Sequence, residues 1–167
     1  MARPGKPPLA SADDIEQQFY EALQQGDLDR LMAAWSDDDD IACIHPGGPR
    51  VVGPAAVRAS FEALFAHGGS VSAQPERVRR LQLGEAAVHH VVEQVQVATE
   101  DGLQSAWVVA TNVYARTAQG WRMVLHHASP GSPRRLCLSG WCWPGTSAGN
   151  RAAGSTITPS KGRRPHG

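Results

Sequence analysis

The chain has little of what marks several large classes of protein. Its 167 residues include three cysteines, Cys43, Cys137 and Cys142, too few for a disulfide framework and not spaced as a zinc-binding pair. No apolar run reaches the roughly 18 residues of a membrane span, so none is expected. Sixteen basic residues balance sixteen acidic ones, and this balance gives no long-range attraction to nucleic acid.

The two ends of the chain differ from its middle. Residues 1–10, MARPGKPPLA, are rich in proline and lack the apolar stretch of a secretory signal, so a cytoplasmic protein is expected. Residues 131–167 are rich in Gly, Pro, Ser and Arg and show no periodicity. Both ends are predicted to be disordered. The length then fits one domain, over residues 11–130.

The first part of this domain has helical signals. Ser11 is a candidate N-cap with Asp14 three residues later, and Gly26 is a candidate C-cap. Apolar residues between them, Ile15, Phe19 and Leu23, recur at helical spacing. A second helix is predicted from Leu28 to Trp35, and a third from Pro54 to about residue 68.

Strand signals lie between and after these helices. Residues 41–45 and 50–52 flank a Pro-Gly turn and predict two short strands. After residue 70 the apolar period becomes two, which predicts strands at 71–83, 86–98, 103–116 and 121–129, with turns at Asp101-Gly102 and Gln119-Gly120. Helices followed by a run of antiparallel strands indicate an α+β fold.

Three segments, in this order, resemble a known superfamily: GDLDRLMAAWSDDD, IHPGG with VVG shortly after it, and GWRMVLHHASP. The chain is similar over about residues 12–130 to the SnoaL-like branch of the NTF2-like proteins. That group includes ketosteroid isomerase and the calcium/calmodulin kinase association domain. The resemblance implies a cystatin-like cone, in which three N-terminal helices pack on a strongly curved antiparallel sheet around a pocket. It also implies a homodimer formed through the outer face of the sheet.

The ketosteroid isomerase comparison predicts a different chemistry for this chain. The resemblance places Phe19 where that enzyme has its oxyanion-binding tyrosine, and His45 where it has its general-base aspartate. The enzyme's second aspartate falls near Asn112 and Val113, where no carboxyl group is present. Because Phe19 cannot donate a hydrogen bond to an oxyanion, steroid isomerisation by that mechanism is not expected.

Two histidines are the catalytic candidates. His45 ends a predicted strand and can exchange a proton near neutral pH, or else simply hydrogen-bonds the turn beside it. Strict alternation in residues 121–129 places Leu125 and His127 on the more apolar, inward face and His126 on the outer face. Since neighbouring strand residues face opposite sides, the pair His126-His127 does not predict a metal site.

Four further residues are candidate ligand contacts besides Leu125. Glu93 lies on the face of Val91 and Val95, where it is either an inward carboxyl with a raised pKa or an outer-surface partner of an arginine. The Asn112 amide is suited to orienting a ligand carbonyl, and Thr111 would face the other way. Phe19 and Trp35 are either pocket walls or core.

The sequence therefore predicts a pocket protein that binds a small hydrophobic molecule. Whether it is an enzyme stays open. A catalytic version would be a cofactor-free isomerase or hydrolase using acid–base chemistry, and the alternative is a non-catalytic dimerisation or assembly domain. No cofactor, metal, nucleic-acid or membrane partner is expected.

Overall fold

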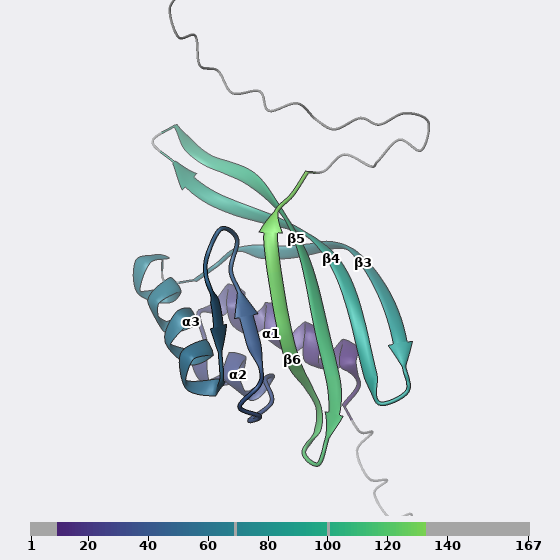
Figure 1. Cartoon of the computed structure of the whole chain (residues 1–167). Helices are drawn as coiled ribbons and strands as arrows, with labels where there is room; N and C mark the ends of the chain where they lie inside the picture. The colour runs from purple at the N-terminus through teal and green to yellow at the C-terminus, as the bar shows by residue number, and fades with distance from the viewer. Residues whose placement is uncertain (1–9, 69, 100, 133–167) are drawn as a thin grey trace, which may run out of the picture. The chain divides into compact units, whose positions relative to one another are not determined.

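A computed structural model describes residues 10–68, 70–99 and 101–132 (Figure 1). The tails that the sequence predicts to be disordered fall almost entirely outside these residues. Among the described helices, none is long and apolar enough to cross a membrane.

The three predicted helices are confirmed. Helix α1, Ala12–Gln25, begins at a capping box, in which the Asp14 amide donates to Ser11 Oγ (3.1 Å) and the Ser11 amide donates to Asp14 Oδ2 (2.7 Å). It ends at Gly26, whose φ of 67° is a left-handed conformation that glycine adopts without strain. Helix α2 spans Leu28–Ala33 and helix α3 spans Pro54–Gly68.

The strands form one six-stranded sheet in the order β2-β1-β6-β5-β4-β3. Their bounds are β1 Ala42–Ile44, β2 Arg50–Val52, β3 Ala73–Leu83, β4 Ala86–Thr99, β5 Gly102–Thr117 and β6 Gly120–Pro130. All neighbours pair antiparallel except β1 and β6, which are parallel, so the sheet is mixed rather than wholly antiparallel as the sequence predicted. A parallel pair needs a long crossover, and here α3 and the strands β2 to β5 lie between the two partners in the chain.

The helices cover one face of this sheet, with α1 running across β4, β5 and β6 (Figure 1). The core lies between them. Its largest fully buried side chains include Phe19 of α1, Leu31 of α2, Phe61 of α3 and Tyr114 of β5. We refer to the helix-covered side of the sheet as the concave face and to the opposite side as the outer face.

A β-bulge in β6 changes which side chains face the helices. Val113 of β5 pairs with Leu125, but the next residue, Tyr114, pairs with Met123, so Val124 is an extra residue. The segment after α2 lies beside β6 at this point, and its Ser36 amide donates a hydrogen bond to the Met123 carbonyl (2.9 Å). The bulge shifts the alternation by one residue.

The inward placement of His127 and Leu125 is therefore wrong. His126 is buried, at 5% exposure, whereas His127 is exposed and Leu125 lies on its side of the strand. Strict alternation places a histidine correctly only where the ladder is regular, and Val124 breaks the ladder between Met123 and His126.

Candidate functional site

The concave face carries an unusual number of buried polar side chains. Alternate residues of β4 and β5, the strand β6 beyond its bulge, and one side of α1 all point into the same region. The residues concerned are Glu16, Tyr20, His89, Glu93, Asn112, Tyr114 and His126. Burying polar and ionisable groups costs free energy unless they are hydrogen-bonded, and such groups concentrate at functional sites.

Four of these residues form one hydrogen-bonded chain. His126 Nδ1 lies 2.7 Å from Asn112 Oδ1, Asn112 Nδ2 donates to Tyr20 Oη (3.2 Å), and Tyr20 Oη donates to Glu93 Oε1 (2.6 Å). Because an amide oxygen only accepts, the proton between the first two residues belongs to His126 Nδ1. Every donor in this chain points towards Glu93, and His126 Nε2 is left with its lone pair.

Burial sets the protonation of this chain. Burial, with Glu16 nearby, raises the pKa of Glu93, although the hydrogen bond from Tyr20 lowers it. Burial and the neighbouring Glu93 raise the pKa of Tyr20 well above its usual value. Burial lowers the pKa of His126 to about 3, with smaller contributions from His45 and His127. At neutral pH His126 is thus uncharged, and Glu93 is the group of this chain whose proton is exchanged most readily.

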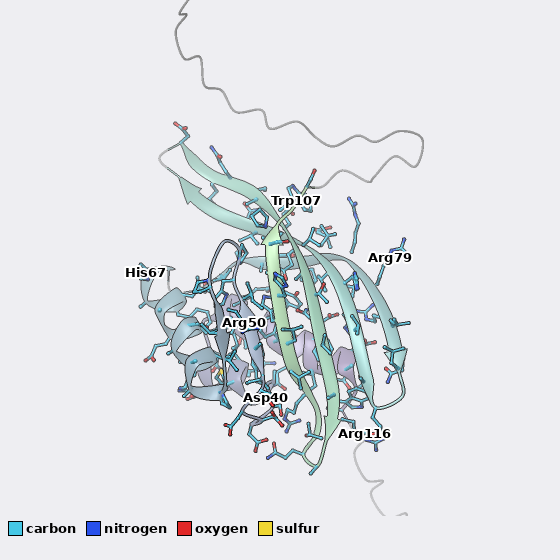
Figure 2. The ribbon with its side chains drawn as sticks, in the orientation of Figure 1. Asp40, Arg50, His67, Arg79, Trp107 and Arg116 are labelled. Carbon is cyan, nitrogen blue, oxygen red and sulfur yellow. The ribbon has the colours of Figure 1, made fainter. Side chains whose placement is uncertain are left out.

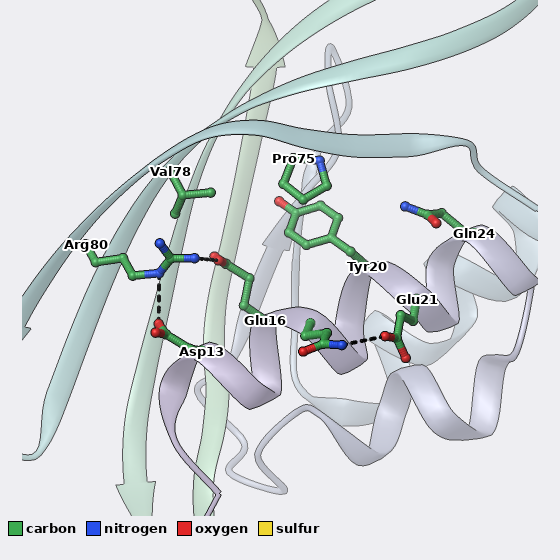
Figure 3. A pocket seen from close by; sticks show the side chains of 9 residues that line it. Asp13, Glu16, Tyr20, Glu21, Gln24, Pro75, Val78 and Arg80 are labelled. Atoms are coloured by element: carbon green, nitrogen blue, oxygen red, sulfur yellow. Dashed lines mark hydrogen bonds and ion pairs between the residues drawn. The ribbon is translucent and has the colours of Figure 1, made fainter.

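A second cluster is centred on Glu16 of α1. His89 Nδ1 lies 2.8 Å from Glu16 Oε2, Tyr114 Oη donates to the same oxygen (3.4 Å), and Arg80 Nη2 donates to Glu16 Oε1 (3.1 Å). Arg80 Nε also lies 2.8 Å from Asp13 Oδ1. Since Arg80 belongs to the edge strand β3, these bonds join the first turns of α1 to the sheet (Figure 3).

A pocket of about 380 Å³ opens between α1 and β3, beside both clusters (Figure 3). We call it the α1–β3 pocket. Most of its lining residues are polar or charged by type, with two apolar residues on the β3 side. The lining residues are Asp13, Glu16, Gln17, Tyr20, Glu21, Gln24, Pro75, Val78 and Arg80.

Two of the predicted ligand contacts lie in an aromatic cluster instead. The rings of Phe19, Trp35 and Phe61 pack edge-on or tilted, with centroids 6.0 to 6.4 Å apart. Neither Phe19 nor Trp35 lines the α1–β3 pocket. Within the described part of the chain, Trp35 Nε1 is the one buried side-chain nitrogen or oxygen without a hydrogen-bond partner.

His45 lies next to this aromatic cluster and away from the α1–β3 pocket. Its ring packs against Phe61 at 4.9 Å, and its Nε2 is 3.1 Å from Ser60 Oγ. Ser60 gives its own proton to the Val57 carbonyl (2.7 Å), so its oxygen accepts from His45 and is not activated as a nucleophile. Burial lowers the pKa of His45. The catalytic role predicted for His45 stays a prediction.

Glu93 and Asn112 are both buried on the concave face, whereas Thr111 is only partly buried. Their role in ligand binding stays a prediction. Sequence reasoning missed Tyr20, which follows Phe19, and it missed Glu16. The signal was a polar stripe on α1, in which Asp13, Glu16, Tyr20 and Gln24 recur at intervals of three and four residues.

The arrangement suits proton transfer to and from a bound molecule. Among residues 10–68, 70–99 and 101–132, no three His, Cys, Asp or Glu side chains are grouped as metal ligands. Glu93 combines a carboxyl group, a raised pKa and a tyrosine partner that lines a pocket, which is the usual composition of an acid–base site.

Comparison with known proteins adds a family and a set of solved structures. The family model of the SnoaL-like domain matches residues 13–133. A Thiobacillus denitrificans structure, provisionally named a calcium/calmodulin-dependent protein kinase type II association domain, is 37% identical, with a TM-score of 0.67. That match covers 76% of this chain and all of the other. No curated protein sequence matches the chain.

Two further structures show the range of proteins with this fold. A Streptomyces avermitilis protein of the NTF2-like family, provisionally named a dehydratase, is 30% identical with a TM-score of 0.63, over 71% of this chain and 91% of that one. The hub domain of the S. rosetta calcium/calmodulin kinase is 20% identical with a TM-score of 0.59, over 77% of this chain and all of the hub. The last likeness shows the fold alone.

Proposed function

Because the chain belongs to the SnoaL-like domain family, we propose that it binds a small molecule in the α1–β3 pocket. We further propose that Glu93, acting beside Tyr20, takes up and returns a proton of that molecule. The observation that carries this proposal is that Tyr20 lines the pocket and its hydroxyl is bonded to the buried Glu93 carboxyl.

The stability cost of this arrangement favours a functional role. A buried polar pair such as Tyr20 and Glu93 could be replaced as a whole by apolar side chains of similar shape with little loss, or even a gain, of stability. A carboxyl of raised pKa is instead well matched to general acid–base catalysis near neutral pH. The reactions that fit are isomerisation and dehydration, in which a base removes a proton next to a carbonyl group. The provisional name of the Streptomyces protein is in line with this class.

The pocket walls offer a ligand both polar groups and apolar surface. Of the nine lining residues, seven carry polar or charged side chains, and Pro75 and Val78 supply an apolar strip. A molecule with hydrogen-bonding groups on one side and a short hydrocarbon portion on the other would match both kinds of wall. Small hydroxy and keto compounds have this character.

A thermal-shift screen of the full chain against small hydroxy and keto compounds tests the proposal. Binding to the native state raises the melting temperature by mass action. Val78→Trp is designed to fill the pocket, and Leu83→Trp is its control, because Leu83 is exposed on the other side of the same strand. We expect hits with the wild type and Leu83→Trp but not with Val78→Trp. Hits that survive Val78→Trp would place binding elsewhere.

Self-association is a second candidate, favoured by a specific feature of the outer face. Four apolar residues form a row across four neighbouring strands, because Leu81 pairs with Val88, Val88 with Val113, and Val113 with Leu125. Leu81 is 55% exposed and the other three are partly exposed, and contiguous apolar surface of this kind is typical of interfaces. The association-domain name of the Thiobacillus neighbour agrees with such a role. We propose a homodimer that buries this row.

A further inference from the structure

The hydrogen bonds that link His126 to Glu93 all have their donors on the His126 side. This donor direction can be reversed. We propose that Glu93 and Asn112 are positioning residues that decide whether His126 presents a lone pair or a proton on its Nε2 atom. This inference goes beyond the proposed function. It does not depend on that function, since the reversal takes place in the free protein.

With Glu93 ionised, its carboxylate accepts a hydrogen bond from the Tyr20 hydroxyl, as the structure shows. The directions of the other two hydrogen bonds follow from this one. The Tyr20 oxygen then accepts from the Asn112 amide nitrogen, which leaves the amide oxygen facing His126 Nδ1. His126 must therefore hold its proton on Nδ1. Its Nε2 is an acceptor, able to bind only a donor group.

With Glu93 protonated, each bond can run the other way. Glu93 takes one proton from solvent and donates it to the Tyr20 oxygen, so the Tyr20 hydroxyl turns to a new acceptor. Asn112 offers one if its side-chain amide rotates by half a turn, which brings its oxygen to Tyr20 and its nitrogen to His126 Nδ1. His126 then loses its Nδ1 proton and gains one on Nε2. Glu93 has gained one proton, and the proton count of His126 is unchanged.

The surroundings of the two ends permit this reversal. Glu93 faces Tyr20 and Glu16 of α1, while His126 faces Asn112 of β5 and lies near the histidines His45 and His127. Burial keeps the pKa of His126 near 3, below the raised pKa of Glu93. His126 thus stays neutral while Glu93 titrates, and only the position of its proton can change.

The consequence is a change in the hydrogen-bonding character of His126. The His126 ring packs against Phe19, with centroids 5.2 Å apart, inside the aromatic cluster that also holds the unpartnered Trp35 Nε1. His126 Nε2 is an acceptor beside this cluster when Glu93 is ionised and a donor when Glu93 is protonated. The charge state at one end of the concave face thereby sets the hydrogen-bonding preference at the other.

Nitrogen NMR of the full chain tests this directly. With histidine labelled by ¹⁵N, protonated and bare ring nitrogens give well-separated signals, and ¹³C-labelled glutamate reports the titration of Glu93. We expect His126 to carry its proton on Nδ1 above the pKa of Glu93 and on Nε2 below it, with both changes at the same pH. A proton that stays on one nitrogen throughout, or one found on Nε2 at high pH, would overturn the proposal.

Two variants distinguish an effect carried by these hydrogen bonds from a general effect of pH on His126. Tyr20→Phe removes only the hydroxyl that links Glu93 to Asn112, so the proton position on His126 should no longer follow Glu93. Ser36→Ala removes a buried hydroxyl outside this hydrogen-bonded chain, one that accepts from the Asp38 amide, and should leave the reversal intact. Equal behaviour of the two variants would contradict the proposal. The wild-type measurement is decisive even if Tyr20→Phe does not fold.

Discussion

Glu93 and His126 illustrate how the environment of single residues sets their chemistry. Both are buried on the concave face, yet burial pushes their proton equilibria in opposite directions because it disfavours the charged form of each. The carboxyl group becomes a weaker acid and the imidazole a weaker base. In a pair of this kind Glu93 changes its charge as it titrates, while His126 stays neutral and changes only the position of its proton.

The lowered pKa of His126 predicts a loss of stability in acid. The unfolded chain binds a proton on this histidine near pH 6.5, whereas the folded chain binds one only near pH 3. Above pH 6.5 the histidine is neutral in both states and does not lower the free energy of unfolding. As the pH falls from 6.5 towards 3, the unfolded chain takes up the proton before the folded chain does. The free energy of unfolding therefore decreases, by up to about 1.4 kcal/mol per pH unit. His126→Gln should flatten the pH dependence of the free energy of unfolding, measured with urea. An unchanged slope would contradict the assignment.

At the scale of elements, the bulge in β6 decides which histidine faces the helices. Covalent labelling of histidine by diethyl pyrocarbonate, followed by peptide mass spectrometry, measures this for each residue. We expect rapid modification of the exposed His127 and protection of His126, which is 5% exposed. Rapid modification of His126 with protection of His127 would instead support the regular alternation that the sequence predicted, with His127 facing the helices.

The ion pairs of Arg80 predict a difference between two neighbouring residues of β3. Arg80→Gln removes the bonds to Asp13 and Glu16 that join α1 to the sheet and should lower the free energy of unfolding by about 1–2 kcal/mol, since the guanidinium is half exposed. Arg79 points away from the helices (Figure 2). Arg79→Gln should therefore change stability by less than about 0.5 kcal/mol in the same denaturation experiment. Equal losses would argue against the role of Arg80.

The elements that the sequence predicted are those whose signals are local. The capping box at Ser11, the left-handed turn at Gly26 and the start of α3 at Pro54 depend on a few adjacent residues. Alternation in the uninterrupted strand β4 put Glu93 on the same face as Val91 and Val95, but it did not decide whether that face was turned towards the helices. The bulge at Val124 was not predictable, because it depends on a segment near Ser36 that is distant in sequence. The parallel pairing of β1 with β6 is equally non-local.

At the scale of the whole molecule, the outer apolar row predicts self-association. Light scattering of the purified full chain should give the mass of a dimer. Val113→Asp places a charge in the middle of the row and should shift the equilibrium to monomers. Gln119→Asp, in the exposed turn before β6, is a control for the added charge. A monomeric wild type, or a dimer unaffected by Val113→Asp, would exclude this interface.

Binding of a small molecule between α1 and β3, beside Tyr20 and Glu93, can be tested at the level of the whole molecule. The most direct measurement is NMR mapping of the full chain with a compound that raises its melting temperature. We predict shifts concentrated at residues that line the α1–β3 pocket, including Gln24 and Val78, and a change in the titration of Glu93. Shifts confined to the outer face, around Val88 and Val113, with Glu93 unaffected, would contradict it.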